Sequence, residues 1–175
     1  MILFLQFMKK IKFFNRSGNY HYAPLPAISP YSSINKNRIK NTKFSFRKTE
    51  QFTKKIIKNP KKWLDVGTAN GEFIYYLANK WIKTQFIGLD ITSEFIEVAK
   101  KINKNSKNTK FYCENVFRIN KKVYKSDVVT CLGTFGIFPN PKKILNTLLD
   151  LVNKKGVLIV DGRFNSSKVS ANIRF

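Results

Sequence analysis

The sequence predicts an α/β fold, a mostly parallel sheet of about five strands with helices on both of its faces. Apolar runs of strand length alternate with segments of helical periodicity, and strands joined through helices form right-handed crossovers. The chain has 175 residues and a hydrophobic content of 43%, enough to bury the core of one domain. The predicted strands lie near 62–66, 85–90, 109–114, 127–132 and 156–161, and the predicted helices near 71–80, 93–104 and 141–152.

Residues 1–43 are predicted to be an extension that is partly loop. Residues 15–33 are rich in Gly, Pro, Ser, Asn and Tyr, which favours extended structure. The first fourteen residues have apolar side chains at helical spacing with lysines between them, at Leu3, Phe7, Ile11 and Phe14. Such a pattern predicts a helix that packs on its own domain, on a partner or on a membrane surface.

The domain itself is assigned to residues 44–175. It is predicted to begin with a helix over about 46–58, which Asn59 and Pro60 end. The segment 116–124, which follows the third predicted strand, has only a weak helical pattern.

A glycine-rich turn follows the first strand of this domain, in the string Asp65-Val66-Gly67-Thr68-Ala69-Asn70-Gly71. Gly67 and Gly71 permit backbone conformations that a Cβ would penalise, and they allow a ligand to approach the backbone closely. The helix that begins near Gly71 presents unpaired N–H groups at its start. The turn therefore predicts a site where a polar ligand lies directly on the backbone.

Asp90 ends the next apolar run, about 20 residues beyond the glycine turn. At that distance a carboxylate can accept hydrogen bonds from both hydroxyls of a ribose. The two features together indicate an adenosine-containing cofactor. The nicotinamide fingerprint G-x-G-x-x-G fits poorly, because Ala69 and Glu72 occupy two of its glycine positions.

The string from Asp65 to Gly71 resembles the acidic-x-Gly-x-Gly-x-Gly motif of class I S-adenosylmethionine-dependent methyltransferases, with alanine replacing the middle glycine. The resemblance extends over roughly residues 62–162 and implies a Rossmann-like sheet with strand order 3-2-1-4-5. It also implies S-adenosylmethionine as the cofactor. The later strings that resemble family strands are 86–91, 108–115, 126–135 and 155–161.

The same resemblance implies which residues contact the cofactor. Asp65 would orient the turn and the amino group of the cofactor, Asp90 would bind the ribose, and Glu114 would lie at the adenine amino group. Plainer readings stay open, since Asp90 could cap the following helix and Glu114 could be an ordinary polar strand end. The complete predicted set is Asp65, Gly67, Thr68, Ala69, Gly71, Asp90, Ile91, Glu114, Asn115, Val116 and Leu132.

Residues for the methyl acceptor are expected after the fourth and fifth strands. Thr134, Phe135 and Phe138 are predicted to line an acceptor pocket, although a loop packed on the core fits the sequence equally well. Asp161 and Arg163 could bind an acidic or hydroxylated acceptor.

His21 is the only histidine. It could act as a general base for a hydroxyl acceptor, and a surface histidine is the alternative. Cys113 and Cys131 are expected to be buried thiols without a disulfide, and no metal site is expected.

The chain is shorter than the resemblance leads one to expect. A complete class I methyltransferase usually continues past its fifth strand through another helix and an antiparallel hairpin, whereas Phe175 lies about 14 residues after Asp161. An uncovered fifth strand would expose unpaired backbone groups. The sequence leaves two explanations, a truncated reading frame, or an edge covered by the N-terminal segment or by a partner, for example in a homodimer.

The net charge of +23 raises the question of nucleic acid, because basic surfaces gain affinity by releasing counterions from phosphates. The basic residues are mostly lysines scattered through every segment, which is equally typical of a solvated surface. The sequence shows neither a signal peptide nor an apolar run of membrane-spanning length, and a cytoplasmic protein is expected.

These observations predict a methyltransferase that acts on a small-molecule acceptor, such as a sugar or another cell-surface precursor. An RNA methyltransferase is the alternative enzyme, and a truncated inactive domain that binds cofactor or partners is the alternative of another class. The Asn/Asp-Pro-Pro-aromatic signature of base N-methylation does not follow the fourth strand, where the chain reads Leu132-Gly133-Thr134-Phe135.

Overall fold

The computed structural model describes residues 2–6, 10–14 and 42–162. His21, Arg163 and the loop expected at 15–33 lie outside these residues. No helix in the described ranges has the length and hydropathy needed to cross a membrane.

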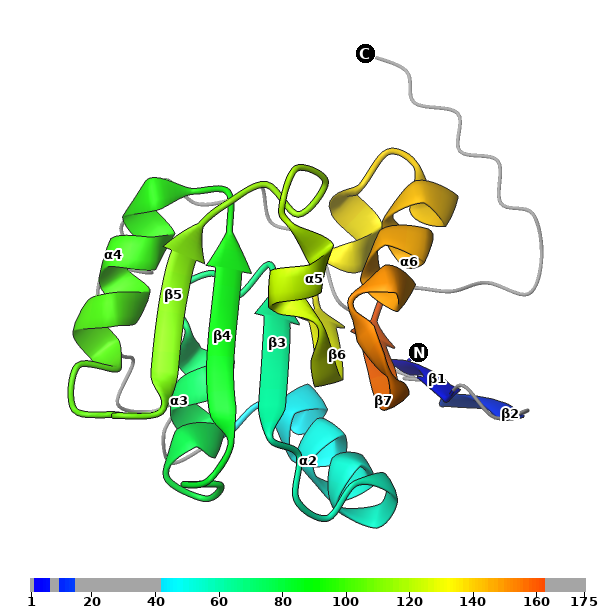
Figure 1. The fold of residues 1–175 in the computed structure, drawn as a ribbon, viewed down its shortest axis with the longest axis horizontal. Helices are drawn as coiled ribbons and strands as arrows, with labels where there is room; N and C mark the ends of the chain where they lie inside the picture. The colour runs from blue at the N-terminus through cyan, green and yellow to red at the C-terminus, as the bar shows by residue number, and fades with distance from the viewer. Residues whose placement is uncertain (1, 7–9, 15–41, 163–175) are drawn as a thin grey trace.

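The described residues form one seven-stranded sheet in the order β2-β1-β7-β6-β3-β4-β5. Five of the strands are parallel, and their order β5-β4-β3-β6-β7 confirms the predicted 3-2-1-4-5 arrangement (Figure 1). These five strands are β3 (Lys62–Val66), β4 (Gln85–Asp90), β5 (Thr109–Cys113), β6 (Ser126–Leu132) and β7 (Val152–Asp161).

The N-terminal segment covers the edge of the fifth parallel strand. Strand β1 (Ile2–Gln6) pairs antiparallel with β7, with Ile2 opposite Asp161 and Gln6 opposite Val157, and β2 (Lys10–Phe14) pairs antiparallel with β1. The helix suggested by the spacing of apolar residues in this segment is therefore wrong. The strand β1 pairs with the edge N–H and C=O groups of β7, which a helix could not do. The open sheet edge therefore decided the local structure of this segment.

This pairing also removes the reason to expect a partner chain at the fifth strand. The edge of β7 is occupied by β1 of the same chain (Figure 1).

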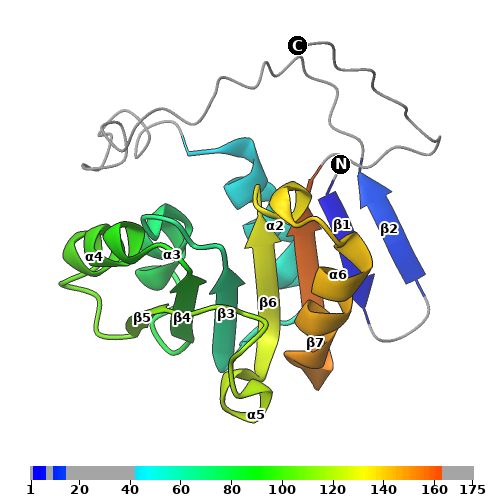
Figure 2. The same ribbon diagram turned by 90° about the horizontal axis from the view of Figure 1, so that it is seen from above.

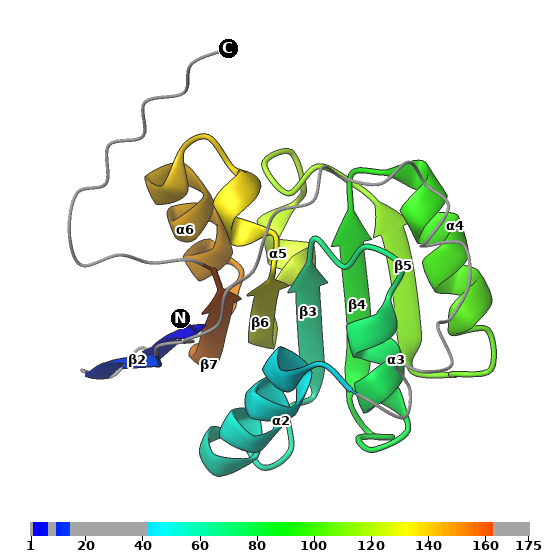
Figure 3. The ribbon, with the colours of Figure 1, turned by 180° about the vertical axis from the view of Figure 1, so that it is seen from behind.

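Helices lie on both faces of the sheet, as predicted (Figure 2). One face carries α2 (Phe44–Ile56), α3 (Glu72–Ala78) and α4 (Ser93–Ile102), which Figure 3 shows from behind. The opposite face carries the short α5 (Lys121–Tyr124) and α6 (Pro141–Asp150). A single turn of 3₁₀ helix, η2 (Phe135–Ile137), connects β6 to α6.

The two-residue period of the strands divides the core into two layers. Trp63 packs among buried side chains of α2, α3 and α4, whereas its neighbour Leu64 packs with Ile144 and Leu148 of α6. Both layers are apolar because the central parallel strands are buried on both faces. The sheet is thereby packed on both faces. Its connecting loops lie at the amino ends and at the carboxyl ends of the parallel strands.

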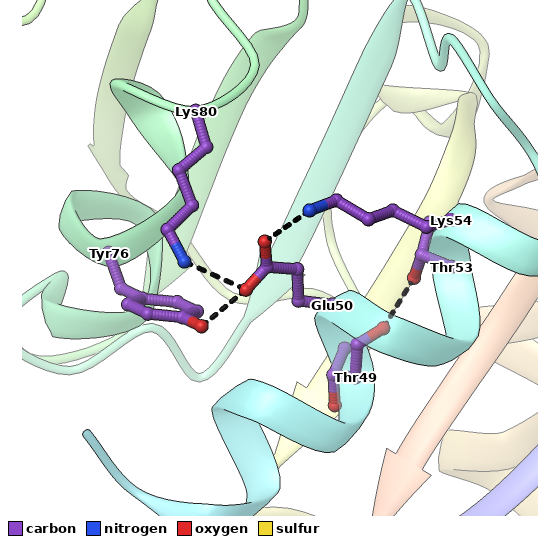
Figure 4. A network of polar contacts seen from close by, with 6 residues as sticks. All are labelled: Thr49, Glu50, Thr53, Lys54, Tyr76 and Lys80. Atoms are coloured by element: carbon purple, nitrogen blue, oxygen red, sulfur yellow. Dashed lines mark hydrogen bonds and ion pairs between the residues drawn. The ribbon is translucent and has the colours of Figure 1, made fainter.

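Helix α2 is attached to α3 by a carboxylate network (Figure 4). Glu50 of α2 accepts hydrogen bonds from Lys54, from Lys80 at 2.8 Å and from the hydroxyl of Tyr76. Burial by itself raises the pKa of Glu50, but these hydrogen bonds outweigh it and lower the pKa to about 2. Helix α2 is therefore held against α3.

Candidate functional site

The carboxyl ends of the parallel strands bring the predicted cofactor residues to one edge of the sheet. The register places Val66 of β3 opposite Leu89 of β4, and Asp90 opposite Cys113 of β5. The residues that follow each strand end therefore lie side by side, where ligands of open α/β sheets bind.

The turn after β3 has the conformation that the glycines predicted. Gly67 and Gly71 both have φ of 73°, a region that L-residues rarely occupy. The N–H groups of Gly67 and Thr68 both donate to the carbonyl of Leu89, at 2.8 and 3.0 Å, which holds the turn against the end of β4. The start of the turn is thus joined to the end of β4 by two backbone hydrogen bonds.

Neighbouring side chains leave no room for a Cβ at Gly67. A Cβ there would lie 2.4 Å from the hydroxyl oxygen of Thr134, which itself donates to the Gly67 carbonyl at 3.3 Å. Thr134, which the sequence predicts to line an acceptor pocket, contacts the glycine turn in the structure. Close packing of this kind is what makes glycine necessary at position 67.

Ala69 replaces the middle glycine of the motif and keeps the left-handed conformation, with φ of 48°. It is the only non-glycine residue with positive φ in the described part of the chain. Its N–H donates to the Asp90 carboxylate at 2.9 Å, which compensates for the backbone strain.

Asp90 lies at the centre of the site. Its two carboxylate oxygens accept from the N–H groups of Ala69 and Thr92, at 2.9 and 3.0 Å, so the side chain is held in one orientation. The bond to Thr92 lies at the start of α4, in line with the capping role considered from the sequence. Asp90 is only half-buried, so lone pairs remain for a ligand. Ile91 beside it is 69% exposed and offers an apolar surface for a ring.

Asp65 is buried behind the turn and bonded through Thr130 on the neighbouring strand. The indole N–H of Trp63 donates to the Thr130 hydroxyl at 3.1 Å, and that hydroxyl donates to Asp65 at 2.7 Å. Burial raises the pKa of Asp65 to about 6, with hydrogen bonding to the carboxylate opposing it. With a pKa of about 6, the carboxyl is mostly ionised at pH 7 and gains a proton as the pH falls below 6.

The end of β5 supplies a more polar wall. The hydroxyl of Tyr124 donates to the carboxylate of Glu114 at 2.8 Å. Asn115 accepts from the N–H of Phe117, and Val116 is buried in the core. Glu114 and Asn115 remain half-buried at the expected edge. Val116 therefore packs in the core below this edge.

The two phenylalanines proposed for the acceptor pocket differ in burial. Phe135 is buried in the core, which is the alternative that the sequence had left open. Phe138 is partly buried, and the centre of its ring lies 5.8 Å from that of Phe117. Ile137, the residue before Phe138, is 66% exposed. Leu132 at the end of β6 is half-buried, and Asp161 at the end of β7 is buried.

The expected burial of the two cysteines holds for Cys131 only. Cys131 is fully buried, and burial raises the pKa of its thiol to about 12, so it is not a nucleophile at neutral pH. Cys113 is exposed, contrary to the expectation, because β5 is an edge strand on which only Phe111 is buried. Both are free thiols.

The start of α2 contributes to the site by charge. Lys43, just before the helix, forms an ion pair with Glu72 at 3.3 Å, and Glu72 begins the helix that follows the glycine turn. Sequence reasoning missed Lys43, Trp63 and Thr130 as residues that position the site. The only local signal was a polar threonine within the apolar run of the fourth strand.

The sequence profile of the family described as methyltransferase domain matches residues 57–173, about two thirds of the chain. The chain belongs to this methyltransferase family. The class predicted from its glycine turn, a Rossmann-like domain dependent on S-adenosylmethionine, is confirmed.

A malonyl-[acyl-carrier protein] O-methyltransferase of Bacillus anthracis is 29% identical to this methyltransferase domain over 97 residues. The aligned region is 55% of this chain and 35% of that relative. The chain thus spans about a third of the length of the curated relative.

Two solved structures illustrate the likeness in fold. The plantazolicin methyltransferase BamL, solved with a triazolic desmethylPZN analog and SAH, is 26% identical, with a TM-score of 0.57 over 70% of this chain and 47% of that one. PKMT2 from Rickettsia typhi, solved with AdoHcy, is 25% identical, with a TM-score of 0.52 over 57% of this chain and 20% of that one. Both neighbours hold S-adenosylhomocysteine, the product of the predicted cofactor.

Proposed function

We propose that this methyltransferase domain binds S-adenosylmethionine at the carboxyl edge of its sheet and transfers the methyl group to a small-molecule acceptor. The observation that carries the proposal is the pairing of the glycine turn with Asp90. A half-buried carboxylate fixed by two backbone N–H groups stands beside a turn too closely packed for a Cβ at Gly67.

The residues at this edge fit the cofactor in charge and polarity. Asp90 would accept the ribose hydroxyls, and the exposed side chain of Ile91 would cover one face of the adenine ring. Glu114 and Asn115 would contact the adenine edge. Asp65, ionised behind the turn, would stabilise the positively charged amino group of the cofactor.

S-adenosylmethionine supplies an already activated methyl group, so the protein contributes mainly by positioning. Holding the acceptor and the methyl group in near-attack geometry supplies much of the rate without a dedicated base. A base is needed only where the acceptor must lose a proton. His21 stays a prediction for that role, and His21→Ala tests it, because a base would lower kcat whereas a surface histidine would leave it unchanged.

The acceptor is proposed to be a small molecule with an apolar part. The support is the exposed side chain of Ile137 and the partly buried ring of Phe138, which follow β6 at the same edge as Asp90. A sugar acceptor has less support from these side chains. BamL was solved with a triazolic desmethylPZN analog, a non-nucleic-acid ligand, which agrees with an acceptor of this class.

Calorimetry with S-adenosylmethionine and S-adenosylhomocysteine tests the proposal. Asp90→Asn keeps the size of the side chain but removes the charge, and we expect it to weaken binding at least tenfold. Glu97→Gln serves as the control, because Glu97 is exposed on α4, where it forms an ion pair with Lys100 at 2.9 Å. A folded wild-type chain that binds neither compound contradicts the proposal.

Methyl transfer separates an enzyme from an inactive domain. A chain that binds S-adenosylmethionine is incubated with small-molecule extracts and, separately, with RNA, and transfer of labelled methyl is followed. Transfer into the small-molecule fraction supports the proposal, transfer into RNA favours the alternative enzyme, and binding without transfer favours an inactive domain.

A further inference from the structure

Two hollows lie at the edge of the sheet opposite the proposed methyl-transfer site, and a third continues from them along β5. Three adjoining hollows of about 580, 240 and 310 Å³ run from the loop before β3 to the groove between α4 and β5. The first two share Lys83, and the last two share Lys110, so they form one continuous track. In Figure 1 the loops that line the first two hollows lie below the parallel strands.

Two side chains fasten the loops that form this track. The amide of Asn108 donates to the carbonyls of Ala78, Trp81 and Thr84, at 3.2, 3.2 and 3.0 Å, and so joins the loop before β4 to the loop before β5. The hydroxyl of Thr84 donates to the carbonyl of Pro60 at 2.7 Å, which joins the loop before β3 to the same group. The three loops are therefore held side by side in one arrangement.

The track is lined by cations. Its lysines lie in all three loops, are exposed, and share the track with no carboxylate among the described lining residues. Asp127, at the nearby start of β6, has its carboxylate engaged by the N–H groups of Lys61 and Lys62. The central lysines are Lys58, Lys61, Lys83, Lys107 and Lys110.

Apolar surface is interleaved with these charges. Ile82, between the first two hollows, is 74% exposed, and Trp81 beside it is half-buried. At the far end Tyr112 is 37% exposed on the wall of the third hollow. Single-stranded nucleic acids are bound by such surfaces, because cations follow the phosphates while aromatic side chains stack on bases.

We propose that this lysine track binds a single strand of nucleic acid, at a site separate from that of methyl transfer. Lysines act as point charges toward phosphates and do not select a sequence, so the binding is independent of base order. A concave track fits a flexible strand better than a membrane surface, which is flat. The first two hollows lie at the opposite ends of the strands from Asp90, so a strand bound along them leaves the methyl-transfer site free.

Fluorescence anisotropy with a labelled 20-nucleotide oligouridylate tests the proposal in the full chain. If six of the eight lysines that line the track each neutralise one phosphate, the slope of log affinity against log salt is about −4 for a single strand, and the affinity falls by about 300-fold from 50 to 200 mM salt. The variant Lys83→Gln/Lys107→Gln/Lys110→Gln removes three of these charges, and we expect a slope of about −2.

The matched control is Lys48→Gln/Lys122→Gln/Lys142→Gln, which removes the same charge from exposed lysines of α2, α5 and α6 outside the track. An equal loss in both variants would overturn the proposal, because the binding would then follow net charge alone. Tighter binding of a duplex than of the single strand would overturn it too, as would track-dependent binding only to vesicles of anionic lipid. Unchanged binding in Asp90→Asn supports the separation of the two sites.

Discussion

Asp65 is expected to limit the stability of the protein while it serves the cofactor site, and Asp65→Asn separates the two effects. The carboxylate is buried and ionised at neutral pH, and Thr130 provides its strongest hydrogen bond at 2.7 Å. An asparagine oxygen can accept the same hydrogen bond without the cost of burying a charge.

The magnitude follows from the pKa. Burial raises the pKa of Asp65 from 3.8 to about 6, which corresponds to about 3 kcal/mol of unfavourable free energy for the ionised form in the folded state. Because the folded pKa is the higher one, protonation of Asp65 favours the folded state, and this stabilisation is fully present below pH 3.8 and is lost as the pH rises through 6. Between pH 5 and pH 7.5 the loss is about 1.4 kcal/mol.

Urea unfolding of the wild type and Asp65→Asn at pH 5.0 and pH 7.5 measures this difference. We expect the variant to be more stable by up to about 3 kcal/mol at pH 7.5, with a smaller advantage at pH 5.0. Calorimetry at pH 7.5 is expected to show weaker binding of S-adenosylmethionine, since the charge opposite its amino group is gone. A stability difference that stays the same at both pH values would refute the reasoning.

Two further predictions concern the turn and α2. Gly67→Ala should lower the free energy of unfolding by about 2 kcal/mol or more, because its Cβ would meet Thr134. Gly133→Ala, at the same φ of 73° with nothing within 4 Å, should lower it by only about 1 kcal/mol of backbone strain. Equal losses in thermal unfolding would contradict the contact argument. The lowered pKa of Glu50 gives stability that is present above pH 4.5 and lost as the pH falls toward 2. Glu50→Gln should lose about 1 to 2 kcal/mol at pH 7, since its lysine partners are about half exposed, and should show a flatter acid unfolding curve by circular dichroism; a curve that matches the wild type would count against the network.

Much of the fold could be predicted because its signals are local. The parallel strands and most of the helices were placed from apolar periodicity, and the glycine turn was recognised from seven consecutive residues. Asp90 followed from its distance along the chain. These features depend on backbone conformation and strand ends, which neighbouring residues largely specify.

The tertiary structure decided what depends on contacts between distant segments. Residues 2–6 became a strand because the edge of β7 was open to them, and Cys113 is exposed because β5 is the last strand of the sheet. The hydroxyl that holds Asp65 comes from a strand 65 residues later, and the amide of Asn108 fastens loops that the sequence keeps 24 to 30 residues apart.

The sequence by itself determined the class of the domain, its methyl donor and the residues of the glycine turn, because a motif of consecutive residues carries them. Only the tertiary structure decided which side chains hold that motif in place, which strand covers the edge of β7 and where the lysines gather. Strand pairing and burial join residues whose positions in the sequence give no sign of contact.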